Sequence, residues 1–180
     1  MTISTTTIKN SYSGNSSTDA FAYTFKISDQ DHMQVIIRSS TGTETVKSLS
    51  THYTVSGVGN SSGGTVTFTS GNIPATGETV ILRRNTTQTQ GLDLIENDPL
   101  PADNLETAFD KNLSISQELQ EQIDRSFKVS RTNTITSSEF TTNATDRANR
   151  AIGFDDDGDL TTIASFNPVG GDSALFQYST

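Results

Sequence analysis

The sequence predicts a mainly β protein with one long α-helix. The expected architecture is a small N-terminal antiparallel sandwich or barrel, then a coiled-coil-like helix and an extended C-terminal segment. Short strands with alternating apolar residues recur about every 8–14 residues in the first half of the chain, as in small sandwiches and barrels. One long stretch then has helical periodicity. Only 31% of the 180 residues are hydrophobic, so the core of a single chain is thin and help from other chains is expected.

These signals divide the chain into four segments. Residues 1–98 form the predicted β domain and residues 99–128 the helix. Residues 129–147 are rich in Ser, Thr and Asn, and we expect them to form an extended linker. Residues 148–180 contain a short β-hairpin and a C-terminal segment whose few apolar residues are expected to dock onto another surface.

The first strands have a clear period of two. Residues 1–12 alternate loosely, which predicts an exposed edge strand or an arm that pairs with another chain. The next two segments alternate more regularly, so each predicts a strand with one buried face. The residues expected on these buried faces are Phe21, Tyr23, Phe25, Ile27, Met33, Val35 and Ile37.

The remaining strands of the β domain are short and separated by turn residues. We expect strands in residues 44–49, 52–55, 65–69 and 79–89. In the last of these, Val80 and Leu82 point to one face. The pair Arg83 and Arg84 has two interpretations: it contacts carboxylates of a partner, or it belongs to a charged, exposed strand face that discourages edge-to-edge association.

The helix is predicted over residues 101–127. Pro99 and Pro101 end any preceding strand, and Asp103 and Glu106 suit the positive end of a helix. No Gly or Pro interrupts the segment beyond Pro101. Its apolar residues fall mostly three or four positions apart and so form one stripe: Leu105, Phe109, Leu113, Leu119, Ile123 and Phe127.

The same helix can be interpreted in two ways. Alternating steps of four and three residues define a possible seam between helices, in which Asn112 and Ser116 are polar. Polar residues in a seam cost stability but fix register and oligomer number. The alternative is an amphipathic helix that lies on the sheet of its own domain, and spacing alone does not decide between them. The seam consists of Leu105, Phe109, Asn112, Ser116, Leu119 and Ile123, with Ser126 as its last member.

The C-terminal part contains one acidic cluster. Residues 150–163 predict a small hairpin with a turn at residues 155–159, where four of five residues are Asp. Such a cluster could hold Ca²⁺, but an EF-hand needs Gly and Glu at positions where this chain has other residues. Asp and Gly are the usual residues of a solvated turn, which is the interpretation that we favour.

Composition and motifs exclude several classes of function. Cysteine is absent, so neither a disulfide nor a thiolate metal site is available, and a metal site built from His32 and His52 is not expected. The net charge of −9, without a basic cluster, argues against a nucleic-acid partner. We find no signal peptide, membrane-spanning run, phosphate loop or catalytic motif. The expectation is therefore a non-enzymatic protein without catalytic residues, cofactor or metal.

The order of these features resembles a known family. The segments are TDAFAYTF (residues 18–25), MQVII (33–37), HYTV (52–55), GTVTF (64–68), TVILRRNT (79–86) and the helix opening PADNLETAFDKNL (101–113). Together they resemble the N-terminal, tail-attachment domain of tail fibre proteins from short-tailed phages (podoviruses). The resemblance covers about residues 15–128. The hairpin sequence AIGFDDDGDL (151–160) is similar to segments that recur after this domain in phage fibres.

The resemblance implies a virion structural protein of the phage tail. The chain would be a homotrimer whose β domain binds the tail adaptor and nozzle proteins, and whose helix begins a three-stranded shaft. Such fibres usually continue into a receptor-binding tip, whereas this sequence stops at Thr180. The chain is then expected either to anchor a separate receptor-binding protein or to leave the tip to other chains. A carbohydrate- or cell-surface-binding β module is the rival expectation, and a depolymerase fragment is a third.

Overall fold

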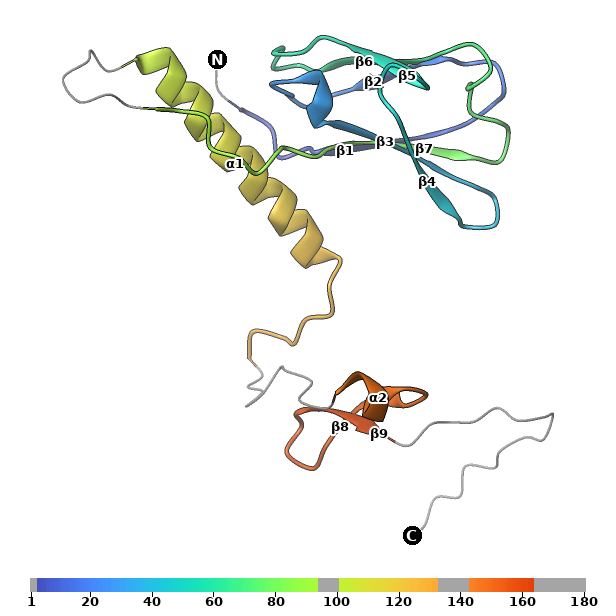
Figure 1. Ribbon diagram of the computed structural model, residues 1–180, viewed down its shortest axis with the longest axis vertical. Coiled ribbons are helices and arrows are strands. Elements are labelled where there is room, and N and C mark those ends of the chain that lie inside the picture. Colours follow the sequence, from blue (N-terminus) through green and yellow to red (C-terminus); the bar gives the residue numbers. More distant parts are fainter. Residues whose placement is uncertain (1–2, 94–100, 133–142, 164–180) are drawn as a thin grey trace. The chain divides into compact units, whose positions relative to one another are not determined.

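The computed structural model describes residues 3–93, 101–132 and 143–163. The chain separates into two compact units, Met1–Ser126 and Phe127–Thr180. The first contains the β domain and the long helix, and the second contains a short helix and a hairpin (Figure 1). None of the described helices is both long and apolar enough to cross a membrane.

The β domain contains a four-stranded antiparallel sheet. Its order is β1 (Lys9–Ser13), β7 (Thr79–Arg84), β3 (Met33–Arg38) and β4 (Glu44–Lys47). The arm predicted at the N-terminus therefore pairs, through β1, with β7 of its own chain at the sheet edge. Residues 39–43 form the turn that joins β3 to β4 in an antiparallel hairpin.

A second, three-stranded antiparallel sheet packs on the first. Its order is β2 (Ala20–Tyr23), β6 (Gly64–Phe68) and β5 (Tyr53–Ser56). A 3₁₀ turn, η1 (Gln30–His32), leads into β3. The two sheets appear as separate layers in Figure 1.

The core lies between the two sheets, so the β domain is a small sandwich. The alternation predicted from the sequence is confirmed, because every residue expected on the buried faces of the first strands is buried. Among the described residues, the apolar core cluster contains none from the long helix. Its members are Phe21, Tyr23, Phe25, Ile27, Met33, Val35, Ile37, Tyr53, Val66, Phe68, Val80 and Leu82.

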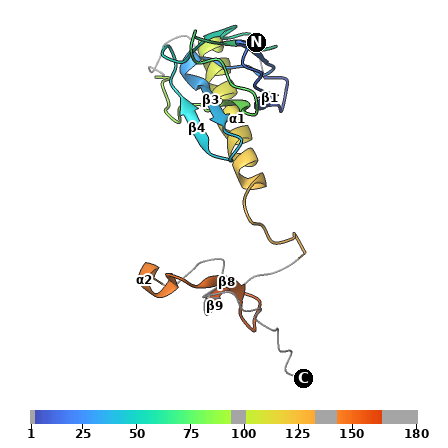
Figure 2. The same cartoon turned by 90° about the vertical axis from the view of Figure 1, so that its right-hand side faces the viewer.

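The long helix α1 (Ala102–Asp124) begins directly after Pro101, as the proline and acidic signals predicted. It ends at Asp124 rather than at Phe127, where the apolar periodicity ended. In both views α1 runs beside the β domain (Figures 1 and 2). Contacts from α1 to Lys9, Lys26 and Arg84 hold it there.

The second unit contains α2 (Ala144–Arg147) and the hairpin of β8 (Ala151–Phe154) and β9 (Leu160–Ile163). The hairpin is confirmed where the sequence predicted it. The one-turn helix α2 falls inside the segment expected to be an extended linker, and the Asn143 side chain caps it by accepting from the backbone N–H groups of Thr145 and Asp146. The predicted docking residues Phe166, Leu175, Phe176 and Tyr178 lie outside the described residues.

Candidate functional site: the two faces of helix α1

Helix α1 turns a polar face toward the β domain. Asp110, Ser114 and Glu118 are each 5% exposed and are the buried residues of the helix. They recur every four positions and so lie on one side of the helix. Gln117 and Glu121 lie on the same side. We call these five residues the polar face.

The centre of the polar face is an ion pair with a strand of the sandwich. Arg84, at the end of β7, is 1% exposed, and its Nε lies 2.9 Å from Oε1 of Glu118. The guanidinium also donates to Oε1 of Gln117 at 2.6 Å and to the backbone oxygen of Ser114 at 3.3 Å. A buried arginine requires such partners, since an unpaired charge away from water is very costly.

The carboxylate of Glu118 is satisfied on its other side by Thr86. The backbone N–H of Thr86 donates to Oε2 at 2.9 Å and its hydroxyl donates to Oε1 at 2.6 Å. Among the described residues, every buried side-chain nitrogen and oxygen has a hydrogen-bond partner. The contact between helix and sandwich is therefore polar but fully satisfied, which is the condition for such a contact to be rigid.

Three further contacts connect the polar face to the N-terminal part of the chain. Lys26 Nζ lies 2.7 Å from Oδ2 of Asp110, and the backbone N–H of Ile3 donates to Oδ1 of the same carboxylate at 3.2 Å. Gln117 donates to the backbone oxygen of Thr5 at 3.0 Å. The N-terminal segment is thus attached to the helix as well as to β7.

The last contact of the polar face is more exposed. Glu121 accepts from Arg125 at 2.8 and 2.9 Å and from Lys9 at 3.4 Å. The hydrogen bond from Arg125 lowers the pKa of the Glu121 carboxyl, against a smaller opposing effect of burial. Exposed pairs of this kind contribute little to stability.

The apolar stripe of α1 lies on the other side. Phe109 is 67% exposed, Ile123 50%, Leu119 45% and Leu113 44%. At about 3.6 residues per turn, Phe109 lies about 140° and Ile123 about 180° around the helix from Ser114. An apolar stripe that rests on the chain's own sheet, one of the two sequence interpretations, is therefore not what this helix forms. We use "apolar stripe" below for Leu105, Phe109, Leu113, Leu119 and Ile123.

The predicted seam residues share this outward side. Leu105 is half-buried, and Asn112 and Ser116 are exposed between the apolar residues. The hydroxyl of Ser116 donates to the backbone oxygen of Asn112 at 2.9 Å, so it is satisfied within the helix. The seam remains a prediction, because the structure contains one chain.

The pairing of Arg84 was missed at the level of the sequence. Arg84 contacts a carboxylate of its own chain and is buried, so neither a partner's carboxylate nor an exposed strand face describes it. The signal was present: Val80, Leu82 and Arg84 are spaced by two, and the arginine continues the inward face.

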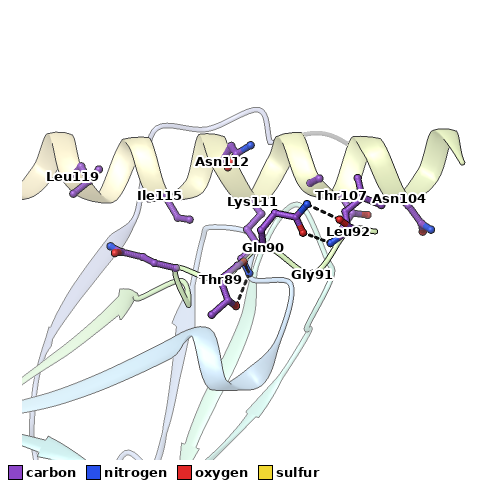
Figure 3. A pocket seen from close by; sticks show the side chains of 12 residues that line it. Thr89, Gln90, Gly91, Leu92, Asn104, Thr107, Lys111, Asn112, Ile115 and Leu119 are labelled. Atoms are coloured by element: carbon purple, nitrogen blue, oxygen red, sulfur yellow. Dashed lines mark hydrogen bonds between the residues drawn. The ribbon is translucent and has the colours of Figure 1, made fainter. Parts of the chain in front are cut away.

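A groove runs along one flank of α1 (Figure 3). Its volume is about 600 Å³. Gln90, Gly91 and Leu92 form one wall, and Ala108, Ile115 and Leu119 form part of the other. Lys111 donates to the backbone oxygen of Thr89, and the Gln90 amide bonds both backbone groups of Leu92, so these polar groups are already paired. We call this space the α1 groove.

The acidic cluster of the second unit forms a tight turn. Oδ1 of Asp155 accepts from the backbone N–H groups of Asp157 and Asp159, at 3.1 and 2.8 Å. Gly158 has φ of 80°, a left-handed conformation that glycine adopts readily, and its N–H donates to the backbone oxygen of Asp155 at 3.0 Å. Within the described part of the chain, no group of three or more His, Asp or Glu is placed to hold a metal ion.

No protein-family model matches the chain. Over 123 residues the chain is 35% identical to a tail spike protein of Salmonella phage epsilon15. The match covers 67% of this chain but 11% of the tail spike, so the chain corresponds to a small part of that protein. The similarity relates the chain to phage tail proteins and suggests a place in the virion tail.

Proposed function

We propose that this chain is a trimeric, non-enzymatic subunit that attaches a fibre or spike to the adaptor and nozzle proteins of a phage tail. In this role the sandwich binds the tail, and three copies of α1 associate through their apolar stripes. Any receptor-binding part would lie elsewhere, either in a separate protein or in further sequence. The similarity to a tail spike protein supports the general class.

The observation that carries the proposal is the orientation of α1. A helix that packs only on its own domain buries its apolar side. Here the buried side is charged, and the apolar stripe includes Phe109 at 67% exposure. Exposed apolar side chains gathered on one side of a helix, here on either side of Asn112 and Ser116, favour an interaction site. Burying one such side chain is worth about 1.5–3 kcal/mol, so three stripes that cover one another stabilise an assembly substantially.

The heptad pattern agrees with this arrangement. If Phe109, Ser116 and Ile123 occupy position a, and Leu105, Asn112 and Leu119 position d, then the polar face falls on positions b, c and f. Those positions point outward in a coiled coil. Each helix could therefore keep its own sandwich on the outside of a bundle while its seam faces the other two helices.

The mass of the purified chain in solution tests the proposal. Multi-angle light scattering is expected to give about three times the 19.3 kDa chain mass. A folded chain that remains monomeric at high concentration would contradict it, and glycan binding would then become the function to examine.

Substitutions in the seam make the test specific. Leu119→Asp or Ile123→Asp is expected to abolish the trimer, because a desolvated carboxylate in a seam is costly. Gln122→Asp is the matched control, since it adds the same charge at an exposed neighbouring position of the same helix turn. If the double variant Leu119→Asp/Ile123→Asp still has the trimer mass, the seam assignment is wrong.

A further inference from the structure

We infer that the α1 groove binds the side chain of Leu113 from a second copy of this chain. The inference rests on the proposed trimer. It adds that neighbouring helices are parallel, and that Leu113 of one chain contacts Ala108 of the next. The groove and the apolar stripe are continuous, because Leu119 belongs to both and Asn112 lines the groove while belonging to the seam. Whatever covers the stripe therefore reaches the groove as well.

The two flanks of the seam differ. On the groove side stand Ala108 and Ile115, both half-buried. On the opposite flank stands Leu113, which is 44% exposed. With the seam at positions a and d, Ala108 and Ile115 occupy position g, and Leu113 occupies position e. Each helix thus has a hollow apolar flank and a flank with a projecting apolar side chain.

A parallel arrangement brings these two flanks together. In parallel coiled coils, position g of one helix faces the following e position of its neighbour. The e position that follows Ala108 is Leu113, so the small side chain of Ala108 leaves room where the leucine of the next chain arrives. The same rule places Gln120 of the next chain beside Ile115. A cyclic trimer repeats this contact at each interface.

The chemistry of the groove suits an apolar occupant. Its polar atoms at Thr89, Gln90 and Leu92 are already engaged by Lys111 or by one another, as Figure 3 shows. The rest of the lining is the apolar surface of Ala108, Ile115 and Leu119, together with the side chains of Gln88, Asn104, Thr107 and Asn112. The segment 88–92 would then contact both its own helix and the helix of the neighbour.

Disulfide trapping tests this contact, because the chain contains no cysteine of its own. In the full chain, Ala108→Cys/Leu113→Cys is expected to form a covalent three-chain species on mild oxidation, visible in a non-reducing gel. The same residues within one chain lie on different sides of α1 and cannot pair with each other. Ala108→Cys/Gln120→Cys is the matched control: it also combines positions g and e, but in the wrong heptad, and should not link.

A second pair protects the test against misfolding. Ile115→Cys/Gln120→Cys samples the next heptad and is expected to link in the same way. Light scattering under reducing conditions is measured alongside. A trimer in which neither matched pair links, or in which the control pair links instead, overturns the inference and leaves the proposed function standing. A monomeric parent chain overturns both.

Discussion

At the scale of single residues, Arg84 decides how α1 is held. Its guanidinium is 1% exposed and makes contacts with Glu118, Gln117 and the backbone of Ser114. The attraction between Arg84 and Glu118 adds little net stability, but removing one partner is costly because the other charge would stay buried without a partner. This asymmetry is measurable.

We expect Arg84→Met to lower the free energy of unfolding by about 3–5 kcal/mol, since Glu118 would lose its charged partner while remaining buried. Urea unfolding at neutral pH measures this loss. Arg83→Met, on the opposite face of β7, is the control and should cost little. The double variant Arg84→Met/Glu118→Met should recover much of the loss. A double variant as unstable as the sum of the two single variants would contradict this account.

His32 makes the stability of the folded chain depend on pH. Burial lowers the pKa of the His32 imidazole, against an opposing effect of the carboxylate of Asp29. The folded chain therefore binds this proton less readily than the unfolded chain, whose pKa is about 6.5. The free energy of unfolding therefore decreases as the pH falls below about 6.5, and this loss is absent at higher pH.

We expect His32→Gln to flatten the dependence of stability on pH between 7 and 5. The substitution leaves intact the backbone bonds of His32 with Asp29 and Asn85. Unfolding curves of both proteins at several pH values measure the difference in slope. Equal slopes would show that His32 does not titrate differently in the folded and unfolded chains.

At the scale of elements, strands were easier to predict than the setting of the helix. Period-two alternation is fixed by the strand geometry, and residues such as Phe21, Tyr23 and Val35 therefore indicated their own burial. The existence of α1 was likewise visible in its spacing. The sequence did not indicate which side of α1 faces the sandwich. A polar side is buried only where specific partners, here Lys26 and Arg84, are close enough to pair with it.

The seam predicts a particular effect at Asn112. A polar residue at a seam position lowers stability while restricting register and oligomer number. We expect Asn112→Leu to stabilise the proposed trimer by about 1–3 kcal/mol per buried amide removed and to broaden the distribution of oligomers. Thermal unfolding and sedimentation velocity measure the two effects.

Asp103→Leu is the control for this substitution, because Asp103 is exposed on α1 and lies outside both the seam and the α1 groove. It should leave the oligomer distribution unchanged. An Asn112→Leu chain that is less stable, or that keeps one sharp trimer species, would show that Asn112 does not lie in a seam.

At the scale of the whole molecule, the sandwich and the helix obtain their stability in different ways. The sandwich has its own apolar core, in which no described residue belongs to α1. The helix is attached through charges and leaves its apolar surface to solvent or to other chains. The few apolar residues of the sequence are thus divided between the core of the sandwich and the exposed apolar stripe of α1.

The net charge of the chain determines how its association depends on salt. Each chain carries −9, so association must overcome repulsion between like charges. Salt screens this repulsion, since the Debye length falls from about 30 Å at 0.01 M to about 8 Å at 0.15 M ionic strength. The buried pair of Arg84 and Glu118 is screened much less, so the attachment of α1 to its own sandwich should survive the same change.

We therefore expect the trimer fraction at a fixed, low protein concentration to rise with sodium chloride between 10 and 500 mM (chosen to span about 30 to below 8 Å in Debye length). Sedimentation velocity measures the fraction, and the Leu119→Asp chain, which we expect to be monomeric, controls for effects of salt on the folded chain itself. An apolar seam gains from salt in this way because its attraction does not depend on charge. A trimer that dissociates as salt is added would instead be held by ion pairs between chains, and the apolar stripe of α1 would have another partner.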